Sequence, residues 1–475
     1  MRKAELLTAW RFFMKATAQK IHLPGAGVIG ICFLLTSTAY LAWTYHIMEL
    51  VKAPISEVVT LIIGYLFQAA GIGLFSLLIR RREDLARVSV YAALILHMLC
   101  LVPAVLAGIF IQAAAFGSVM NLFCGWIAGY YLYRLTTDVS AACSAMTLGA
   151  GYSASIVVSW ALSALFGGAL YHSVWILIIC LALTALAFFI LRTEQGKPDS
   201  ETEEMTEEGF SEDIQLPKEA EFRKFLLLAG ALVLVFSIVN SCGFGFPSED
   251  VEKGISVEFS RLFYAAGLLI AGYVNDRNRR YGAICAVAVL VIPFLMMAIR
   301  GEPVSLLIFW VLSYFTFGFY TIYRIILFSD IVRGKGLISL CGFGLLIGRI
   351  GDAAGEALCL AMSGHFVIFV GLTAILYMAA VLLFFRVYLY IYQPEVKPPR
   401  SEQEIFNRFS ARHDLSARER EVLRFLLEEK TNKEIAEELS ISEGTVKYHI
   451  HNLLQKTSCR NRLGLLSAFT AEQDT

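Results

Sequence analysis

The chain has 475 residues, of which 57% are hydrophobic and only 17% are charged. Soluble globular proteins average about 45–50% apolar and about 25% charged residues, so this composition excludes a single soluble enzyme, a disordered protein and a disulfide-rich secreted scaffold. Forty basic and forty acidic residues give a net charge of zero. That total averages an apolar part, up to about residue 392, with an ordinary soluble part after it.

Long apolar runs follow one another through the apolar part. A bilayer core about 30 Å thick needs about 20 mostly apolar residues per helix. Twelve runs meet this requirement, at about 26–45, 58–79, 88–109, 112–133, 139–164, 170–191, 225–246, 257–274, 282–299, 304–328, 337–361 and 366–391. The sequence therefore predicts an all-α membrane bundle, with six spans in residues 1–191 and six in residues 225–392. No cleavage site follows the first run, so we expect no cleavable signal peptide.

Basic residues are concentrated at the N-terminus and in alternate loops. The basic loops carry Arg80, Arg81, Arg82, Arg87, Arg134, Arg192, Lys197, Lys218, Arg223, Lys224, Arg277, Arg279, Arg280, Arg333 and Lys335. The opposite loops hold little beyond Lys52, Lys253, Arg261 and Arg300. Cytoplasmic loops carry the excess of Lys and Arg, so we expect a multi-pass protein of the cytoplasmic membrane with the lipid bilayer as a partner. An even number of spans places both termini in the cytoplasm.

The longest loop, residues 192–224, separates the two sets of six spans. Its core at 199–208 is acidic and poor in apolar residues, which predicts a flexible cytoplasmic linker.

After the eighth run comes Gly272-Tyr-Val-Asn-Asp276-Arg277-Asn-Arg279-Arg280. Together with the six-plus-six arrangement, this segment resembles the cytoplasmic G-x-x-x-D-R-x-G-R-R motif of the major facilitator superfamily. Gly272, Asp276, Arg277 and Arg280 match that motif, whereas Arg279 replaces its second glycine. The resemblance implies a loop that pairs charges between helices and biases the inward- or outward-facing state. The alternative is an anchor that only obeys the positive-inside pattern.

Charged residues inside spans are costly and therefore informative. Gly344, Gly348, Asp352 and Glu356 recur every four residues and share one helix face, with Arg349 three residues before Asp352. Small residues at this spacing allow close helix packing, so we expect the face to point into the bundle. It is either a charge cluster that binds a ligand or ion in a central cavity, or a structural ion pair, or a cluster that water reaches from the cytoplasmic end.

The tenth run is dense in aromatic residues from Phe309 to Tyr323. Such a stripe can line a pocket for a planar organic ligand, with the hydroxyls of Tyr320 and Tyr323 orienting it. The alternative is packing and lipid contact, with Arg324 extending to the cytoplasmic interface. His97, Asn121 and Asn240 are weaker candidates, because a lone polar residue in a bundle usually bonds a neighbouring helix.

Nine of the ten cysteines lie singly in apolar runs, and only Cys459 lies in the soluble part. No Cys or Cys/His spacing is typical of a metal site, so we interpret the cysteines as small buried residues. The chain also lacks a phosphate-binding loop and a kinase signature. The sequence therefore predicts no cofactor, no metal, no catalytic residue and no enzyme.

After a proline-bearing linker at 393–413, residues 414–475 predict four short helices. Ser416-Ala-Arg-Glu419 and Thr431-Asn-Lys-Glu434 are capping boxes that begin the first two. The turn at 440–444 leads into a longer helix that begins near Thr445, and a last helix runs from about 461 to 471. A short helix, a tight turn with glycine and a longer helix form a helix-turn-helix.

The third helix is amphipathic. Val446, Ile450, Leu453 and Leu454 form its buried stripe and leave an outward face. We interpret His449 as packing beside Val446 rather than as a base contact. A helix with such an outward face suits the major groove of double-stranded DNA.

The segments Leu415–Leu423, Thr431–Ala436 and Ile441–His449 are together similar to the LuxR-type DNA-binding domain over about 60 residues. The resemblance implies phosphate contacts for Asn432, Lys433 and Thr445. It implies a groove-facing surface made by Lys447, Tyr448 and His451, and a dimer contact from the last helix through Leu465, Leu466 and Phe469. Glu429 stands where the family usually has glycine, and a left-handed residue other than glycine costs about 1 kcal/mol, so this turn could take another form.

The two parts predict a one-component transcriptional regulator embedded in the membrane. Its transporter-like bundle would bind an unknown small molecule and control a DNA-binding domain that acts as a homodimer. The alternative is a transporter of the major facilitator type with a regulatory DNA-binding tail. A third interpretation makes the tail a protein-interaction module.

Overall fold

The computed structural model describes residues 21–52, 54–166, 170–172, 174–194, 216–217, 219–245, 257–292, 303–362, 364–391 and 402–473. The chain divides into two compact units, Met1–Gln393 and Pro394–Thr475. Every described element of both units is helical. The basic N-terminal segment, the acidic core of the predicted linker at 199–208 and the prolines at 394–399 lie outside the described residues.

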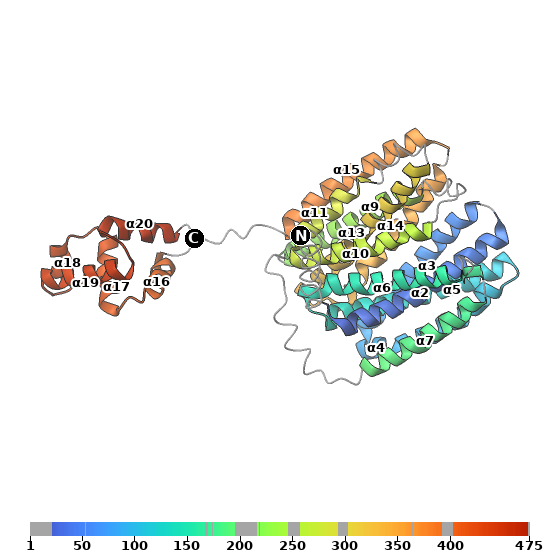
Figure 1. Ribbon diagram of the computed structural model, residues 1–475, viewed down its shortest axis with the longest axis horizontal. Helices are drawn as coiled ribbons and strands as arrows, with labels where there is room; N and C mark the ends of the chain where they lie inside the picture. The colour runs from blue at the N-terminus through green and yellow to red at the C-terminus, as the bar shows by residue number, and fades with distance from the viewer. Residues whose placement is uncertain are drawn as a thin grey trace, which may run out of the picture. The chain divides into compact units, whose positions relative to one another are not determined.

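The first unit, which we call the bundle, consists of long helices packed side by side (Figure 1). Its first half holds α2 (Leu23–Val51), α3 (Pro54–Arg81), α4 (Glu83–Leu106), α5 (Phe110–Asp138), η1 (Ala141–Cys143), α6 (Ser144–Leu165), η2 (Leu170–His172) and α7 (Trp175–Glu194). Its second half holds α9 (Glu219–Gly245), α10 (Val257–Arg277), α11 (Arg279–Val289), α13 (Pro303–Lys335), η5 (Ile338–Leu340), α14 (Phe343–Ala361) and α15 (Phe366–Ile391). The two halves gather on opposite sides of the bundle.

Ten of the described helices are long and apolar enough to cross a membrane, by length and composition. They correspond to ten of the twelve predicted runs. The eighth run, 257–274, forms α10, which is less hydrophobic on average than these ten helices. The ninth run, 282–299, begins in α11 and continues beyond the described residues.

Glycines bring the two halves of the bundle into close contact. Helix α6 of the first half packs against α10 of the second, and α3 packs against α14. A Cβ added at Gly149 would overlap the backbone of Leu268, and one added at Gly272 would overlap the backbone of Ala145. The α6 and α10 backbones therefore approach each other too closely for larger residues at these positions.

Helix α14 presents its glycine- and acid-bearing face to the interior, as its spacing predicts. A Cβ at Gly344 would overlap the carbonyl of Arg324 in α13. Further along the helix, Asp352 and Glu356 are buried, at 4% and 5% exposed. The charged residues of this helix therefore lie inside the bundle.

The second unit, which we call the tail, is a separate helical domain. It contains α16 (Glu402–Arg412), α17 (Ala417–Leu427), α18 (Asn432–Glu438), α19 (Glu443–Lys456) and α20 (Arg462–Gln473). Val422, Leu423, Ile435, Val446 and Leu465 lie in its core. Both predicted capping boxes are present, at Ser416 with Glu419 and at Thr431 with Glu434.

Helix α16 differs from the sequence prediction, which placed residues 393–413 in a linker. Its Phe406 and Phe409 are buried, and both rings contact Phe469 of α20, at centroid distances of 6.5 Å and 5.3 Å. The segment is helical because its apolar residues share one face and this face completes the tail core. The tail domain therefore begins before residue 414.

Four helices of the tail end in the same way. Asp414, Glu429, Ser440 and Ser458 have φ between 45° and 59°, the left-handed region. After α17, the N–H of Lys430 donates to the carbonyl of Phe425 and the N–H of Glu429 donates to that of Leu426. This pair of bonds is a Schellman motif, and it recurs after α16, α18 and α19. Glu429 therefore keeps the left-handed turn that is usual for glycine.

Candidate functional site

A buried charge cluster joins α13 and α14. The Asp352 carboxylate accepts hydrogen bonds from Arg324 Nη1 at 3.1 Å and from the Tyr320 hydroxyl at 3.2 Å. Tyr320 also bonds Ser237 of α9 and accepts a hydrogen bond from Arg324. Because every partner is itself buried, these contacts compensate the cost of removing two charges from water.

The other predicted members of the cluster extend it along α14. Arg349 Nη1 lies 3.5 Å from the Asp352 carboxylate. Glu356 accepts a hydrogen bond of 2.9 Å from the Ser241 hydroxyl, which also donates to the backbone carbonyl of Asp352. The structure thus brings Arg349, Asp352, Glu356 and Tyr320 together.

Two predictions for this region are wrong. Tyr323 does not join the cluster, because three residues beyond Tyr320 its ring turns away and packs against Phe236 and Phe384. Arg324 does not extend to the surface but is 2% exposed and pairs with Asp352. The sequence analysis missed its role because it treated an arginine near a helix end as an interfacial residue.

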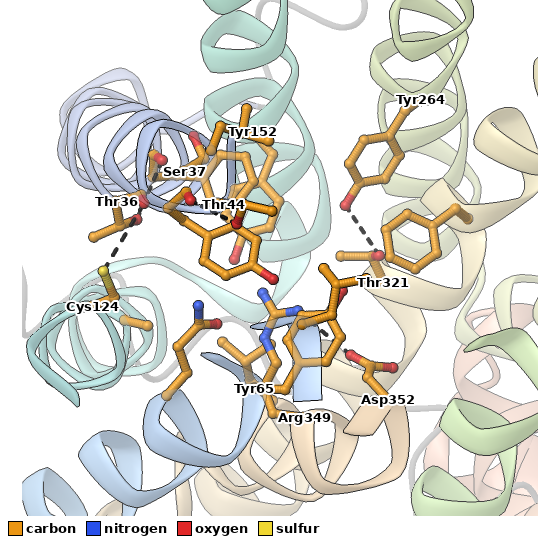
Figure 2. A pocket seen from close by; sticks show the side chains of 18 of the residues that line it. Thr36, Ser37, Thr44, Tyr65, Cys124, Tyr152, Tyr264, Thr321, Arg349 and Asp352 are labelled. Atoms are coloured by element: carbon orange, nitrogen blue, oxygen red, sulfur yellow. Dashed lines mark hydrogen bonds and ion pairs between the residues drawn. The ribbon is translucent and has the colours of Figure 1, made fainter. Parts of the chain in front are cut away.

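A cavity of about 490 Å³ lies against the charge cluster. Its charged lining residues are Arg261, Arg324, Arg349, Asp352 and Glu356. Its aromatic walls include Phe33, Tyr40, Tyr65, Tyr131, Tyr152, Trp160, Tyr264, Trp310, Tyr314 and Phe317. Helices of both halves contribute, among them α2, α3 and α6 from the first half and α13 and α14 from the second (Figure 2). The volume lies within the range of sites for small organic molecules.

The weaker sequence candidates fall into different places. Asn240 lines the cavity. Asn121 instead bonds Gln68 at 2.8 Å and the carbonyl of Gly117, which is the bonding to neighbouring groups that a lone polar residue usually makes. His97 is buried in α4 and does not line the cavity.

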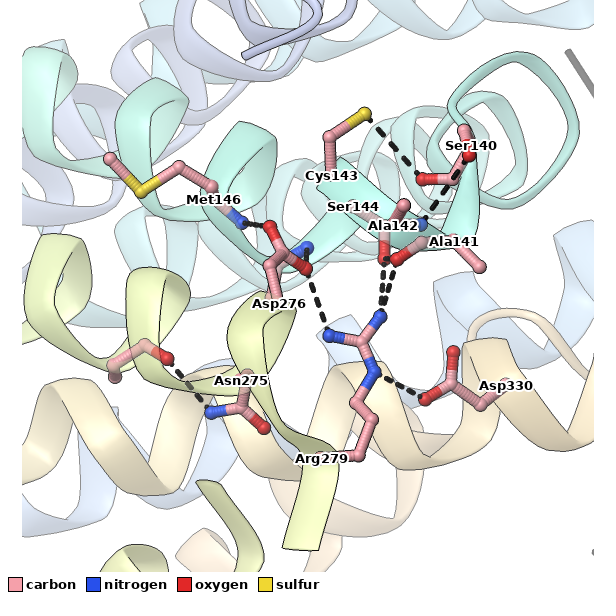
Figure 3. A network of polar contacts seen from close by, with 12 residues as sticks. Ser140, Ala141, Ala142, Cys143, Ser144, Met146, Asn275, Asp276, Arg279 and Asp330 are labelled. Carbon is pink, nitrogen blue, oxygen red and sulfur yellow. Dashed lines mark hydrogen bonds and ion pairs between the residues drawn. The ribbon is translucent and has the colours of Figure 1, made fainter. Parts of the chain in front are cut away.

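A second polar network lies at the other end of α10 and α13 (Figure 3). Asp276 accepts hydrogen bonds from the backbone N–H groups of Ala145 and Met146, in the first turn of α6. Arg279 pairs with Asp276 at 2.8 Å and with Asp330 at 3.0 Å. Tyr264 of the cavity wall precedes Asp276 by 12 residues, or about 18 Å along a helix. The network and the cavity therefore occupy different levels of the bundle.

The arginine that bridges the halves is the one that departs from the predicted motif. Arg279 also donates to the carbonyl of Ala141 at 2.6 Å and to the Ser144 hydroxyl. Of the matching residues, Gly272 lies against α6, and Arg277 is exposed and donates to the Tyr273 hydroxyl. Arg280 is half-buried.

In the tail, α18, the turn after it and α19 form the predicted helix-turn-helix. Val446 and Leu453 are buried, whereas Lys447, Tyr448 and His451 are exposed on the opposite face of α19. Tyr448 is 62% exposed, a large fraction for an aromatic residue. His449 is half-buried, in the position expected for packing.

The residues expected to contact phosphate lie at the N-terminal ends of two helices. Lys433 is exposed in the first turn of α18, where Asn432 is half-buried. Thr445 lies in the first turn of α19, where its N–H and hydroxyl bond the side chain of the N-cap Ser442. Helix N-termini carry partial positive charge and unpaired N–H groups, which suits anions.

Two basic residues at and after the end of α19 have partners within the tail. Lys456 donates to the Glu419 carboxylate at 2.8 Å and to the carbonyl of Asp414. Arg462 donates to the carbonyl of Leu426, a residue of α17. The exposed surface of α19 therefore depends on Lys447 for its fixed positive charge.

Glu419 ties α17 to α19 and makes the stability of the tail sensitive to acid. Burial raises the pKa of its carboxyl, but hydrogen bonds from Lys456 and Ser416 outweigh that effect and hold the pKa below its usual value. A lowered pKa stabilises the fold above the unfolded pKa of about 4.3, and this contribution is lost as the pH falls through the folded value.

We therefore expect Glu419→Gln to reduce the free energy of unfolding of a 394–475 fragment by about 1–2 kcal/mol at pH 7, since a charge-assisted bond to Lys456 is lost. The difference from wild type should shrink below about pH 4. Urea titrations at pH 7, 5 and 3.5, followed by circular dichroism, measure it. A difference that stays constant with pH would contradict this role.

Comparison with known proteins supports this geometry. Residues 413–468 match the model of a family described as bacterial regulatory proteins, luxR family. The chain is 50% identical over 54 residues to the spore germination protein GerE of Bacillus subtilis (strain 168), a match that covers 11% of this chain and 73% of that protein. It is 44% identical over 55 residues to the transcriptional regulatory protein DesR of the same organism, covering 12% of this chain and 28% of DesR. It is 44% identical over 59 residues to the nitrate/nitrite response regulator protein NarP of Escherichia coli (strain K12), covering 12% of this chain and 27% of NarP.

Proposed function

Because the chain belongs, through its C-terminal domain, to the luxR family of bacterial regulatory proteins, we propose that it is a one-component transcriptional regulator embedded in the membrane. The bundle senses a small molecule and controls the binding of the tail to double-stranded DNA. The observation that carries the proposal is that one chain holds both an exposed recognition helix and a charge-lined cavity.

The exposed face of α19 supports DNA recognition. Lys447, Tyr448 and His451 project from a helix whose other side is fixed in the tail core. A helix held in this way can enter the major groove and place these side chains against base edges and phosphates. Asn432, Lys433 and Thr445 are assigned to the phosphates on either side.

Lys447→Ala is expected to weaken binding of a 394–475 fragment to a duplex from the adjoining promoter by about 5- to 100-fold, the range for one lost contact in the groove. Fluorescence anisotropy at several salt concentrations measures the affinity and its salt dependence. Arg418→Ala is the matched control, because it removes one positive charge from the exposed, Glu421-paired surface of α17. Unchanged binding by the Lys447 variant would show that α19 is not the recognition helix.

The tail is proposed to bind DNA as a homodimer, but not through all of the residues first expected. Leu465 and Phe469 are buried in the tail core, so they are not available to a second copy, and Leu466 is half-buried. Leu463 is 79% exposed on the same helix, α20. We therefore assign the dimer contact to the exposed side of α20.

The apolar helices support the membrane assignment. Ten described helices have the length and composition of spans, and the basic residues favour a cytoplasmic position for the loops after α3 and α10. We propose a bundle of the major facilitator type, six spans plus six, in the cytoplasmic membrane with both termini in the cytoplasm. The tail then lies in the cytoplasm, the compartment that holds the DNA.

Sensing requires that the ligand bind one state of the bundle more tightly than the other. A reporter driven by the adjoining promoter, screened against candidate compounds with the full chain and with residues 1–395 deleted, tests this. We expect a compound that changes reporter activity only when the bundle is present. Reporter activity that changes neither with the compounds nor on deletion of residues 1–395 would refute sensing by the bundle.

A transporter with a regulatory DNA-binding tail is the second candidate. The cavity and the Asp276–Arg279–Asp330 network favour it. Helices of both halves line the cavity, and the network bonds Asp276 and Arg279 of the second half to Ala145 and Ala141 of the first, as an alternating-access protein requires. Saturable uptake driven by an ion gradient in vesicles that hold the purified chain would establish the transporter. Absence of uptake for a compound that activates the reporter would establish the regulator.

A further inference from the structure

The charges that line the cavity are unequal in number and differ in how well they are satisfied. Among the described lining residues, three arginines face two carboxylates. Both oxygens of Asp352 accept hydrogen bonds, one from Tyr320 and one from Arg324, and Glu356 accepts one from Ser241. Both carboxylates are therefore already engaged by the protein.

Of Arg324 and Arg349, Arg349 is bonded more weakly by the protein. The Nε of Arg324 also has no hydrogen-bond partner among the described residues, but its Nη1 bonds both Tyr320 and Asp352. The distance from Arg349 to Asp352 is 3.5 Å, longer than the roughly 2.7–2.9 Å of a strong charge-assisted hydrogen bond. The Nε of Arg349 has no hydrogen-bond partner among the described residues. Buried donors are nearly always paired in folded proteins, so this guanidinium calls for an acceptor that is not part of the chain.

The side chains around Arg349 indicate the shape of the ligand that carries this acceptor group. The Arg349 guanidinium lies 4.9 Å from the ring centroid of Tyr65 and, in Figure 2, among the aromatic side chains that line the cavity. Phe33 and Tyr152, which also line the cavity, form a stacked pair with ring centroids 3.9 Å apart. Flat aromatic walls favour a planar apolar ligand, and about 490 Å³ accommodates one of two or three rings.

We propose that the cavity binds small organic monoanions with a carboxylate on a planar apolar body, and that Arg349 binds the carboxylate. A guanidinium presents a planar fork of N–H donors that matches the two oxygens of a carboxylate, whereas an amide lacks the charge and an ammonium lacks the acceptors. This inference rests on the proposed sensing function and names the class of ligand that the bundle senses.

Three matched naphthalene derivatives test the class, namely 2-naphthoate, 2-naphthamide and 2-naphthylmethylamine. Equilibrium dialysis against the purified full chain in lipid nanodiscs, read by naphthalene fluorescence, gives their affinities. We expect saturable binding of 2-naphthoate at sub-millimolar concentration and at least tenfold weaker binding of the amide and the amine. Tighter binding of the amine, equal binding of the amide, or no saturable binding of 2-naphthoate up to millimolar concentration would overturn the proposal.

Substitutions of Arg349 test the assigned partner. Arg349→Gln should weaken 2-naphthoate binding by about 10- to 100-fold and leave the weak binding of the amide unchanged, because only a charge-assisted bond is lost. The affinity of Arg349→Lys for 2-naphthoate should lie between those of wild type and Arg349→Gln, since lysine keeps the charge but loses the planar fork of N–H donors. Arg80→Gln, at the exposed end of α3, is the control and should bind as wild type. Undiminished binding of 2-naphthoate by the correctly folded Arg349→Gln chain would refute the assignment.

The promoter reporter separates this proposal from the sensing function. If 2-naphthoate binds through Arg349 but leaves the reporter unchanged, the ligand class stands and sensing fails. If the reporter responds to the amine and not to the carboxylate, sensing stands and the ligand class fails.

Discussion

Arg279→Gln is expected to destabilise the bundle by about 3–5 kcal/mol, the range for breaking a buried ion pair by removing one partner. Arg279 is 4% exposed and pairs with both Asp276 and Asp330. Glutamine is shorter and neutral, so two carboxylates would remain buried without their counter-charge. The bonds from Arg279 to Ala141 and Ser144, which join α11 to the start of α6, would be lost as well.

Tryptophan fluorescence measures this effect without interference from the tail, because all six tryptophans precede residue 394. Chemical unfolding of the full chain in detergent gives the change in free energy. Arg277→Gln is the control, since Arg277 is exposed and its described bond is to Tyr273 in the same helix. It should change stability by less than about 0.5 kcal/mol. Equal effects of the two variants would contradict a structural role for Arg279.

Phe409→Ala is expected to reduce the free energy of unfolding of the tail by about 3–5 kcal/mol, the usual cost of removing a fully buried aromatic ring. Phe409 is 1% exposed, and its ring packs against Phe469 and His413. Alanine would leave a cavity between α16 and α20. Because the stability of a domain of this size is itself only several kcal/mol, much of the variant would be unfolded near 37 °C.

Urea unfolding of a 394–475 fragment, followed by circular dichroism, measures this loss. Asn407→Ala is the matched control, because Asn407 is exposed on the same helix and its removal leaves no cavity. If Phe409→Ala were as stable as this control, α16 would be an appendage rather than part of the domain.

The sequence predicted those parts of the tail that depend on neighbouring residues. The capping boxes at Ser416 and Thr431 are local signals, and both helices begin where they indicate. The outward face of α19 follows from helical spacing alone. Helix α16 was missed because its stability comes from Phe469, a residue 60 positions later, and no local pattern reports such a contact.

In the bundle, spacing predicted the buried face of α14 but not its partners. Asp352 and Glu356 lie inside because their face also carries the glycines that pack on α13. The pairing of Asp352 with Arg324 crosses between helices and needed the fold to be seen. The role of Arg279 in joining the two halves was not predicted for a different reason. The comparison with the family motif assigned a role to the residues that match it and none to the residue that differs.

The left-handed turns of the tail show how a strained backbone is maintained without glycine. Asp414, Ser440 and Ser458 are each followed by an apolar residue: Leu415 is buried in the tail core, and Ile441 and Cys459 pack against it. Burial of that next residue holds the chain in a conformation that its own side chain disfavours by about 1 kcal/mol or more. The angles between successive helices, and with them the aim of α19, are therefore set by the core rather than by the loops. A substitution that weakens packing in that core would therefore make the orientation of α19 less well defined before the domain unfolds.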